Sequence, residues 1–476
     1  MRRTIIALLS ATLVSLPIFS ATAQDLRFEL QQALNANDYQ RAIEIADRMI
    51  QLYPNEAQDL QKFKTQLQDR LLGIPASSTI STINPSQWKN ARLLRTLQAR
   101  GSVFAAAFSR DGNTLIAGGD KTLEIWNLLS GESKFLLDWV PKKSRYVINS
   151  IAISPNGENF VTGSEGRASQ IRNDSDNCTS SITLDNTGFP NPSINCSWTF
   201  GDTSRDLGAA VQLWDIKTGK QLQNLEITER YSAFGYNLLN YSSDGQTLLA
   251  ADNANGIIWN SSNWERSSFF QIPENQQNRC PRSSAISSDS QIITILDESG
   301  VKIQNLTTKT IERLLPFNSL VTDNSADSLI GLTFPLFGST AISHNRQIVA
   351  ASTEDFLFIW QVSTGKLLHK ITISTASNLQ NKNQFKESEE VFEKFCRPIA
   401  FSPNSRILAM RTEKGSITLW NLQNGEKLKT LIGHPEGNQS SSYVVRTNPS
   451  FITFSPDGRT LISTGTNGKI KFWGVE

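Results

Sequence analysis

Hydrophobic and β-branched residues fall into short runs separated by turn residues along most of the chain. Residues 451–473 show the pattern most clearly, as three apolar runs joined by Ser-Pro-Asp-Gly at 455–458 and by Asn467-Gly468. Pro at the second and Gly at the fourth position favour a β-turn, and Asn-Gly is the strongest short hairpin signal. The stretch therefore predicts a three-stranded antiparallel unit that ends on Trp473.

This unit occurs seven times. The other copies span residues 104–126, 151–215, 239–259, 285–304, 341–360 and 399–420. Six copies end their third strand on a tryptophan (Trp126, Trp214, Trp259, Trp360, Trp420 and Trp473), and Gln304 replaces it in the seventh. A buried tryptophan removes about 150–250 Å² from water, so we expect these six to be core residues rather than a ligand cage. Recurrence of one supersecondary unit predicts a repeat architecture.

A fourth strand follows the third in every copy but the last, at 133–137, 221–225, 267–271, 310–315, 366–371 and 426–431. The sequence stops three residues after Trp473, while an unassigned strand candidate at 91–99 precedes the first copy. Pairing these two ends would complete seven four-stranded sheets and remove the exposed edges. We therefore predict an all-β fold, a seven-bladed β-propeller closed by residues 91–99.

Residues 91–476 resemble the WD-repeat family, although the match is imperfect. Trp214-Asp215 is the only literal Trp-Asp pair and Gly433-His434 the only Gly-His pair. The family's buried Asp–His–Ser/Thr–Trp network could keep its aspartate at Asp120 and Asp355, but three histidines in the chain leave most blades without it. The resemblance implies that second-to-third and fourth-to-first strand connections share one face of the disc.

The N-terminal part predicts export and a small helical unit. Arg2-Arg3, an apolar run at 4–16 and Ala-Thr-Ala at 21–23 have the order of a cleaved signal, with residues 1–23 removed. Residues 24–73 have helical periodicity and resemble one tetratricopeptide helix pair, and residues 74–90 are a Ser/Thr/Pro-containing linker. The helices either pack on the propeller or form a separate docking module. The mature protein is expected to be periplasmic or extracellular, monomeric and not inserted in a membrane; an uncleaved anchor and an internal lumen are alternatives.

Charge and cysteine content narrow the class of partner. The 46 basic and 44 acidic residues among 476 give a net charge of +2, without the clustered basic excess of nucleic-acid binders. Four cysteines fit an oxidising compartment. Cys178 and Cys196 lie in one polar excursion and are candidates for a disulfide, whereas Cys280 and Cys396 occupy similar places in different repeats and either pair or remain buried thiols.

Four irregular segments interrupt the repeats. They are an insertion at 165–209 in the second repeat and long connections at 318–338, 374–397 and 433–450. All are expected on one face, around one mouth of the channel. Eight aromatic residues in these segments are candidate partner-binding anchors: Trp198, Phe200, Phe334, Phe337, Phe385, Phe392, Phe395 and Tyr443. Alternatively, these side chains pack the loops onto the disc.

The sequence offers no catalytic constellation. His344, His369 and His434 fall in separate repeats, and no common nucleophile, phosphate-loop or metal motif occurs. Asp111, Asp244 and Asp457 precede glycine in repeat turns and are interpreted as turn residues. We expect no catalytic residue, metal or cofactor, and predict a non-enzymatic scaffold for a protein or peptide. The alternatives are a propeller enzyme, of the quinoprotein dehydrogenase or metal-dependent hydrolase and lactonase kinds, and a glycan-binding module using Trp198.

Overall fold

The structure is a computed structural model. It describes residues 21–36, 38–54, 57–71, 83–120, 122–136, 145–167, 178–184, 190–196, 210–227, 235–252, 255–271, 284–297, 299–317, 338–353, 355–373, 397–412, 415–434 and 451–475.

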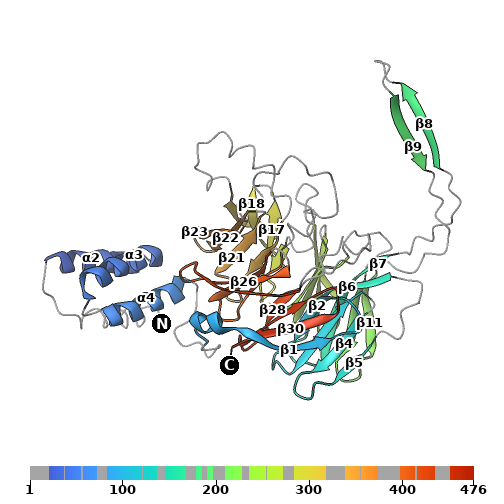
Figure 1. Cartoon of the computed structure of the whole chain (residues 1–476), viewed down its shortest axis with the longest axis horizontal. Helices are drawn as coiled ribbons and strands as arrows, with labels where there is room; N and C mark the ends of the chain where they lie inside the picture. Colours follow the sequence, from blue (N-terminus) through green and yellow to red (C-terminus); the bar gives the residue numbers. More distant parts are fainter. Residues whose placement is uncertain are drawn as a thin grey trace.

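Seven four-stranded antiparallel sheets make up the main body (Figure 1). Blades 1 to 4 comprise β2 (Val103–Phe108), β3 (Thr114–Gly119), β4 (Thr122–Asn127) and β5 (Ser133–Phe135); β6 (Arg145–Ile153), β7 (Asn159–Arg167), β10 (Ala210–Asp215) and β11 (Gln221–Ile227); β12 (Leu238–Tyr241), β13 (Thr247–Ala251), β14 (Asn255–Asn260) and β15 (Arg266–Gln271); and β16 (Ser284–Ile286), β17 (Ile292–Asp297), β18 (Gly300–Asn305) and β19 (Ile311–Pro316). Blades 5 to 7 comprise β20 (Thr340–Ile342), β21 (Ile348–Ser352), β22 (Phe356–Gln361) and β23 (Leu367–Thr372); β24 (Ile399–Phe401), β25 (Ile407–Arg411), β26 (Ile417–Asn421) and β27 (Lys427–Leu431); and β28 (Ile452–Phe454), β29 (Thr460–Thr464), β30 (Lys469–Gly474) and β1 (Arg92–Gln98).

The ring is closed by its most N-terminal strand. β1 pairs antiparallel with β30, from Arg92 opposite Gly474 to Gln98 opposite Lys469, with one irregularity between Leu93 and Arg95. The backbone N–H of Ala99 also donates to Gly468 O at 2.9 Å. The first strands of neighbouring blades contact one another, as β2 does β6 and β24 does β28. The predicted seven-bladed propeller and its closure are confirmed.

One side-chain hydrogen bond recurs in the turn between the first and second strands of every blade. A serine hydroxyl donates to the Asp or Asn two residues later, at 2.5–2.8 Å, in the pairs Ser109–Asp111, Ser154–Asn156, Ser242–Asp244, Ser287–Asp289, Ser343–Asn345, Ser402–Asn404 and Ser455–Asp457. The hydrogen bond from Ser109 is the main reason why the pKa of Asp111 lies below its usual value. The aspartates before glycine are therefore used by the turn itself.

The turn in blade 6 contains an unfavourable residue that can be corrected. Ser405 has φ 56°, where four other blades have glycine, and its buried hydroxyl has no hydrogen-bond partner within the described part of the chain. Ser405→Gly should therefore raise the free energy of unfolding by about 1 kcal/mol, because it removes left-handed strain and an unsatisfied hydroxyl. Urea unfolding tests this expectation.

The matched control reverses the exchange in blade 2. Gly157 has φ 74° and an added Cβ would meet nothing within 4 Å, so Gly157→Ser isolates the backbone cost and should destabilise by about 1 kcal/mol. A Ser405→Gly protein less stable than the parent would contradict this explanation.

The core lies between the blades. The six repeat tryptophans are between 1% and 7% exposed. Two of their indole N–H groups donate to hydroxyls, Trp214 to Thr162 at 3.0 Å and Trp473 to Ser463 at 2.9 Å. The indole of Trp214 also stacks on the Phe160 ring, with 5.9 Å between the ring centroids. Apolar packing across sheet faces therefore holds neighbouring blades together.

The N-terminal helices have a core of their own. α2 (Ala21–Asn35), α3 (Tyr39–Leu52) and α4 (Ala57–Leu71) bury one shared cluster, and Leu368 of β23 packs against it. Asp38 caps α3 by accepting the backbone N–H of Arg41 at 3.1 Å. None of the described helices is both long and apolar enough to cross a membrane.

The end of the segment predicted to be a linker packs on the propeller. Residues 85–90 form a short 3₁₀-helix, η2 (Pro85–Asn90), capped by Asn84. Its Trp88 is fully buried against blades 6 and 7 and meets the Phe454 ring edge-on at 5.4 Å. η2 therefore leads directly into the closing strand.

Candidate protein-binding faces

Antiparallel strands give the disc two different faces. Turns between first and second strands and between third and fourth strands share one end of each blade, which we call the turn face. Second-to-third and fourth-to-first connections share the other end, which we call the loop face. On the turn face, every first-to-second strand connection is a short hydrogen-bonded turn.

Long connections begin and end on the loop face. They join β7 to β10, β19 to β20, β23 to β24 and β27 to β28. The eight aromatic candidates, Trp198, Phe200, Phe334, Phe337, Phe385, Phe392, Phe395 and Tyr443, lie outside the described residues, as do Cys280 and Cys396. The described strands that flank these four segments nevertheless all meet them at the loop face.

Part of the insertion forms a two-stranded hairpin. β8 (Cys178–Leu184) and β9 (Pro190–Cys196) pair antiparallel and make a ribbon that stands away from the blades in Figure 1. The register places Cys178 directly opposite Cys196. Opposed residues in such a ladder have Cα atoms about 4.5–5.5 Å apart, which is within the range that a disulfide spans.

His434 forms a buried network at the start of one loop-face connection. Its Nε2 lies 3.0 Å from Ser463 Oγ, which also accepts the indole N–H of Trp473 at 2.9 Å. The Nε2 also lies 3.1 Å from the Ser463 carbonyl, which can only accept, so Nε2 carries the ring proton. Nδ1 is buried without a hydrogen-bond partner among the described residues. Burial is the main cause that lowers the pKa of His434 to about 4.

This histidine should make the fold sensitive to acid. Its pKa is depressed in the folded state, so the unfolded chain takes up the proton first and stability falls as pH drops from about 6.5 towards 4. Between pH 7 and pH 4 the free energy of unfolding of the wild type should fall by about 3 kcal/mol more than that of His434→Gln. Urea unfolding at both pH values measures this difference. Equal losses in the two proteins would show that His434 does not titrate on unfolding.

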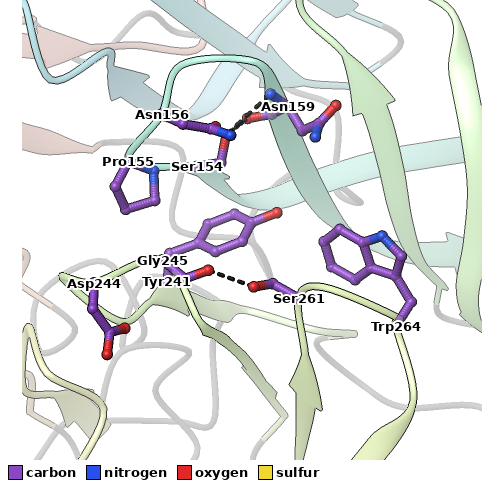
Figure 2. A pocket seen from close by; sticks show the side chains of 9 residues that line it. All are labelled: Ser154, Pro155, Asn156, Asn159, Tyr241, Asp244, Gly245, Ser261 and Trp264. Carbon is purple, nitrogen blue, oxygen red and sulfur yellow. Dashed lines mark hydrogen bonds between the residues drawn. The ribbon is translucent and has the colours of Figure 1, made fainter.

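The turn face has a pocket between blades 2 and 3 (Figure 2). It is open to solvent, and its walls include Asn156, Asn159, Tyr241, Ser261 and Trp264. Tyr241 is 7% exposed, and its hydroxyl has no hydrogen-bond partner among the described residues. Burial raises the pKa of Tyr241, so the hydroxyl stays protonated. Sequence reasoning missed this pocket.

Metal-ligating and histidine side chains are scattered over the described residues. No group of three or more His, Cys, Asp or Glu side chains within that part of the chain could hold a metal ion. His344 is exposed in a turn, whereas His369 is half-buried on β23, where partial burial lowers its pKa, so the two belong to different elements.

Comparison with known proteins agrees with this architecture. A family model for the WD domain, G-beta repeat, matches residues 91–127 and 425–474. The first match begins with β1 and the second runs from the end of blade 6 through β30. Each match thus joins an outer strand to the three inner strands of the next blade, as ring closure requires. The chain therefore contains WD repeats, and the resemblance predicted from the sequence is confirmed.

Curated relatives match this WD-repeat chain over part of their length. They include autophagy-related protein 16 of Arabidopsis thaliana, 23% identical over 32% of this chain and 25% of the relative. Human apoptotic protease-activating factor 1 is 39% identical over 16% of the chain and 6% of the relative. Antiviral protein SKI8 of Saccharomyces cerevisiae is 27% identical over 24% of this chain and 31% of the relative. The chain therefore spans less than a third of each of these proteins.

The fold has solved counterparts. A chain in the crystal structure of a mitotic checkpoint complex superposes with a TM-score of 0.51 and 12% identity. The superposition covers 84% of the WD-repeat chain and 94% of that chain. At this identity the likeness shows the propeller fold alone.

Proposed function

We propose that this protein is an exported, non-enzymatic scaffold that binds a protein or peptide on the loop face of its propeller. The observation that carries the proposal is the asymmetry of the ring. Four long connections, which carry the eight aromatic candidates, start and end on the loop face, whereas hydrogen-bonded turns form the first-to-second strand connections on the turn face. Variable loops on a rigid scaffold commonly carry binding function.

The insertion in blade 2 can be removed while the pairing of β7 with β10 is kept, at the cost of residues 165–167, the end of β7 that pairs with β6. Ser164 and Ala210 are directly paired in β7 and β10. Replacing residues 165–209 with Asn-Gly should close this pair as a two-residue hairpin. Capture of partners from the exported fraction by this variant should fall at least about tenfold, the effect of losing one strong anchor.

The control changes the turn face instead. Leu129 is 79% exposed in the turn after β4, and Leu129→Ser should capture partners as well as the intact protein. Unchanged capture by the hairpin variant would contradict the loop-face proposal.

Export is supported by residues 1–23, with their basic start, apolar run and small-residue site. N-terminal sequencing of protein recovered outside the cytoplasm should begin at Gln24. Recovery of the protein with an intact Met1 from the cytoplasm would contradict export.

A disulfide between Cys178 and Cys196 completes the proposal. Their opposed register supports the bond. Closing this loop would stabilise the folded hairpin by roughly 3 kcal/mol on the chain-entropy estimate. Peptide mapping without reductant should recover the two cysteines in one linked fragment, and separate thiol-labelled fragments would contradict the bond.

A further inference from the structure

The pocket on the turn face lies at the two positions where blade 3 departs from the other blades. The residue before the turn serine is Phe or Ile in the other six blades (Phe108, Ile153, Ile286, Ile342, Phe401 and Phe454), but Tyr241 in blade 3. Tyr241 thus adds a hydroxyl at a position that an apolar side chain fills in the other blades, and none of the described residues accepts a hydrogen bond from it.

The second departure is in the turn between the third and fourth strands. Four blades place a positive-φ glycine there (Gly131, Gly219, Gly365 and Gly425), and blade 4 has Lys309. Blade 3 has Trp264 at φ 58°, an uncommon conformation for a bulky residue. Backbone strain of this kind concentrates at ligand sites. Figure 2 shows Trp264 on the side of the pocket toward which the Tyr241 hydroxyl is directed.

The chain itself shows what such a cleft can hold. Blade 6 begins its turn with the same Ser-Pro-Asn sequence as blade 2, and Phe454 of blade 7 corresponds to Tyr241. Between blades 6 and 7 this cleft is filled by the segment before β1. Trp88 lies edge-on to Phe454, and Asn404 Nδ2 donates to the Ile83 carbonyl at 3.4 Å. A short segment with one aromatic side chain, here Trp88 of η2, therefore fits between two blades.

The corresponding groups between blades 2 and 3 are in place. Asn156 corresponds to Asn404, and its Nδ2 donates to Glu158 at 2.8 Å, which uses one of two amide protons. The Tyr241 hydroxyl supplies another donor. The pocket lining contains no Lys, Arg or His, so it has no cation to recognise an anionic ligand.

We propose that the pocket between blades 2 and 3 is a second binding site, separate from the loop face, for a short peptide. The peptide places an aromatic or large aliphatic side chain beside Trp264. One of its backbone carbonyls accepts the Tyr241 hydroxyl, which gives a buried donor its missing partner. The peptide's role matches that of residues 83–88 between blades 6 and 7.

The test is selection from a phage-displayed heptapeptide library on the full chain. Selected peptides should contain an aromatic or large aliphatic residue. Tyr241→Phe should weaken their affinity about fivefold, as expected for one hydrogen bond. Phenylalanine already occupies the corresponding position in blades 1, 6 and 7, so this variant should fold. Trp264→Gly should weaken binding at least about tenfold.

Lys309→Gly is the matched control, because it makes the same change at the same turn position in blade 4. It should leave peptide affinity unchanged. Selection of no peptide, or of peptides that bind wild type, Tyr241→Phe and Trp264→Gly equally, would overturn the proposal. Selection of an oligosaccharide from a glycan array at this pocket, with no peptide, would overturn it as well.

Discussion

Removing residues 1–99 is expected to lower the propeller's free energy of unfolding by at least about 5 kcal/mol. Removing residues 1–82 should change that free energy by less than about 1 kcal/mol. The longer deletion removes β1 and η2, and leaves β30 as an unpaired edge. It also takes away Ala99 and Trp88, which are 4% and 0% exposed. The shorter deletion removes the helices and keeps the strand.

Urea unfolding followed by tryptophan fluorescence measures this difference. Hydrogen exchange then locates it, because the amides of β28, β29 and β30 should exchange faster after the longer deletion. A third protein that lacks residues 1–90 keeps β1 and separates the contribution of η2. Equal stability of the proteins lacking residues 1–82 and 1–99 would contradict closure by β1.

Trp88→Ala should destabilise the propeller by about 3–5 kcal/mol, the usual cost of emptying a large aromatic site in a core. Trp88 is fully buried between η2 and blades 6 and 7, in one cluster with Leu419 and Phe454. Its indole N–H has no hydrogen-bond partner among the described residues, so the loss should come from packing.

Thermal and urea unfolding of Trp88→Ala test this expectation. Leu129→Ala is the control, since that side chain is 79% exposed and its removal should stay within about 0.5 kcal/mol. A loss at Trp88 no larger than that at Leu129 would show that η2 does not contribute to the stability of the ring.

The repeat made the fold predictable from sequence. Each blade needs the same turn hydrogen bond and the same buried core residue. Turn residues such as Ser455 and Asp457 therefore recur, as do the tryptophans at the ends of third strands. The closing strand could be predicted because one unmatched strand remained at each end. Residues 74–90 have no hydrophobic periodicity, only a high Ser/Thr/Pro content. The burial of Trp88 could therefore not be predicted from the sequence pattern.

The pocket could not be predicted in the same way. Tyr241 is an ordinary strand residue by local pattern, and Trp264 an ordinary aromatic near a turn. Most other blades have an apolar residue at the position of Tyr241 and glycine at the position of Trp264. In blade 3 both unusual residues line one pocket. Aligning the seven turns would have been the sequence signal that singled them out.

Cross-linking of the native protein in its exported fraction, followed by mass spectrometry, tests the scaffold function most directly. The scaffold proposal predicts reproducible links to a partner protein that concentrate on loop-face segments, such as residues 374–397, and disappear when residues 165–209 are replaced by Asn-Gly. Absence of links to any other protein above the background, or links confined to the turn face and unaffected by that replacement, would contradict it.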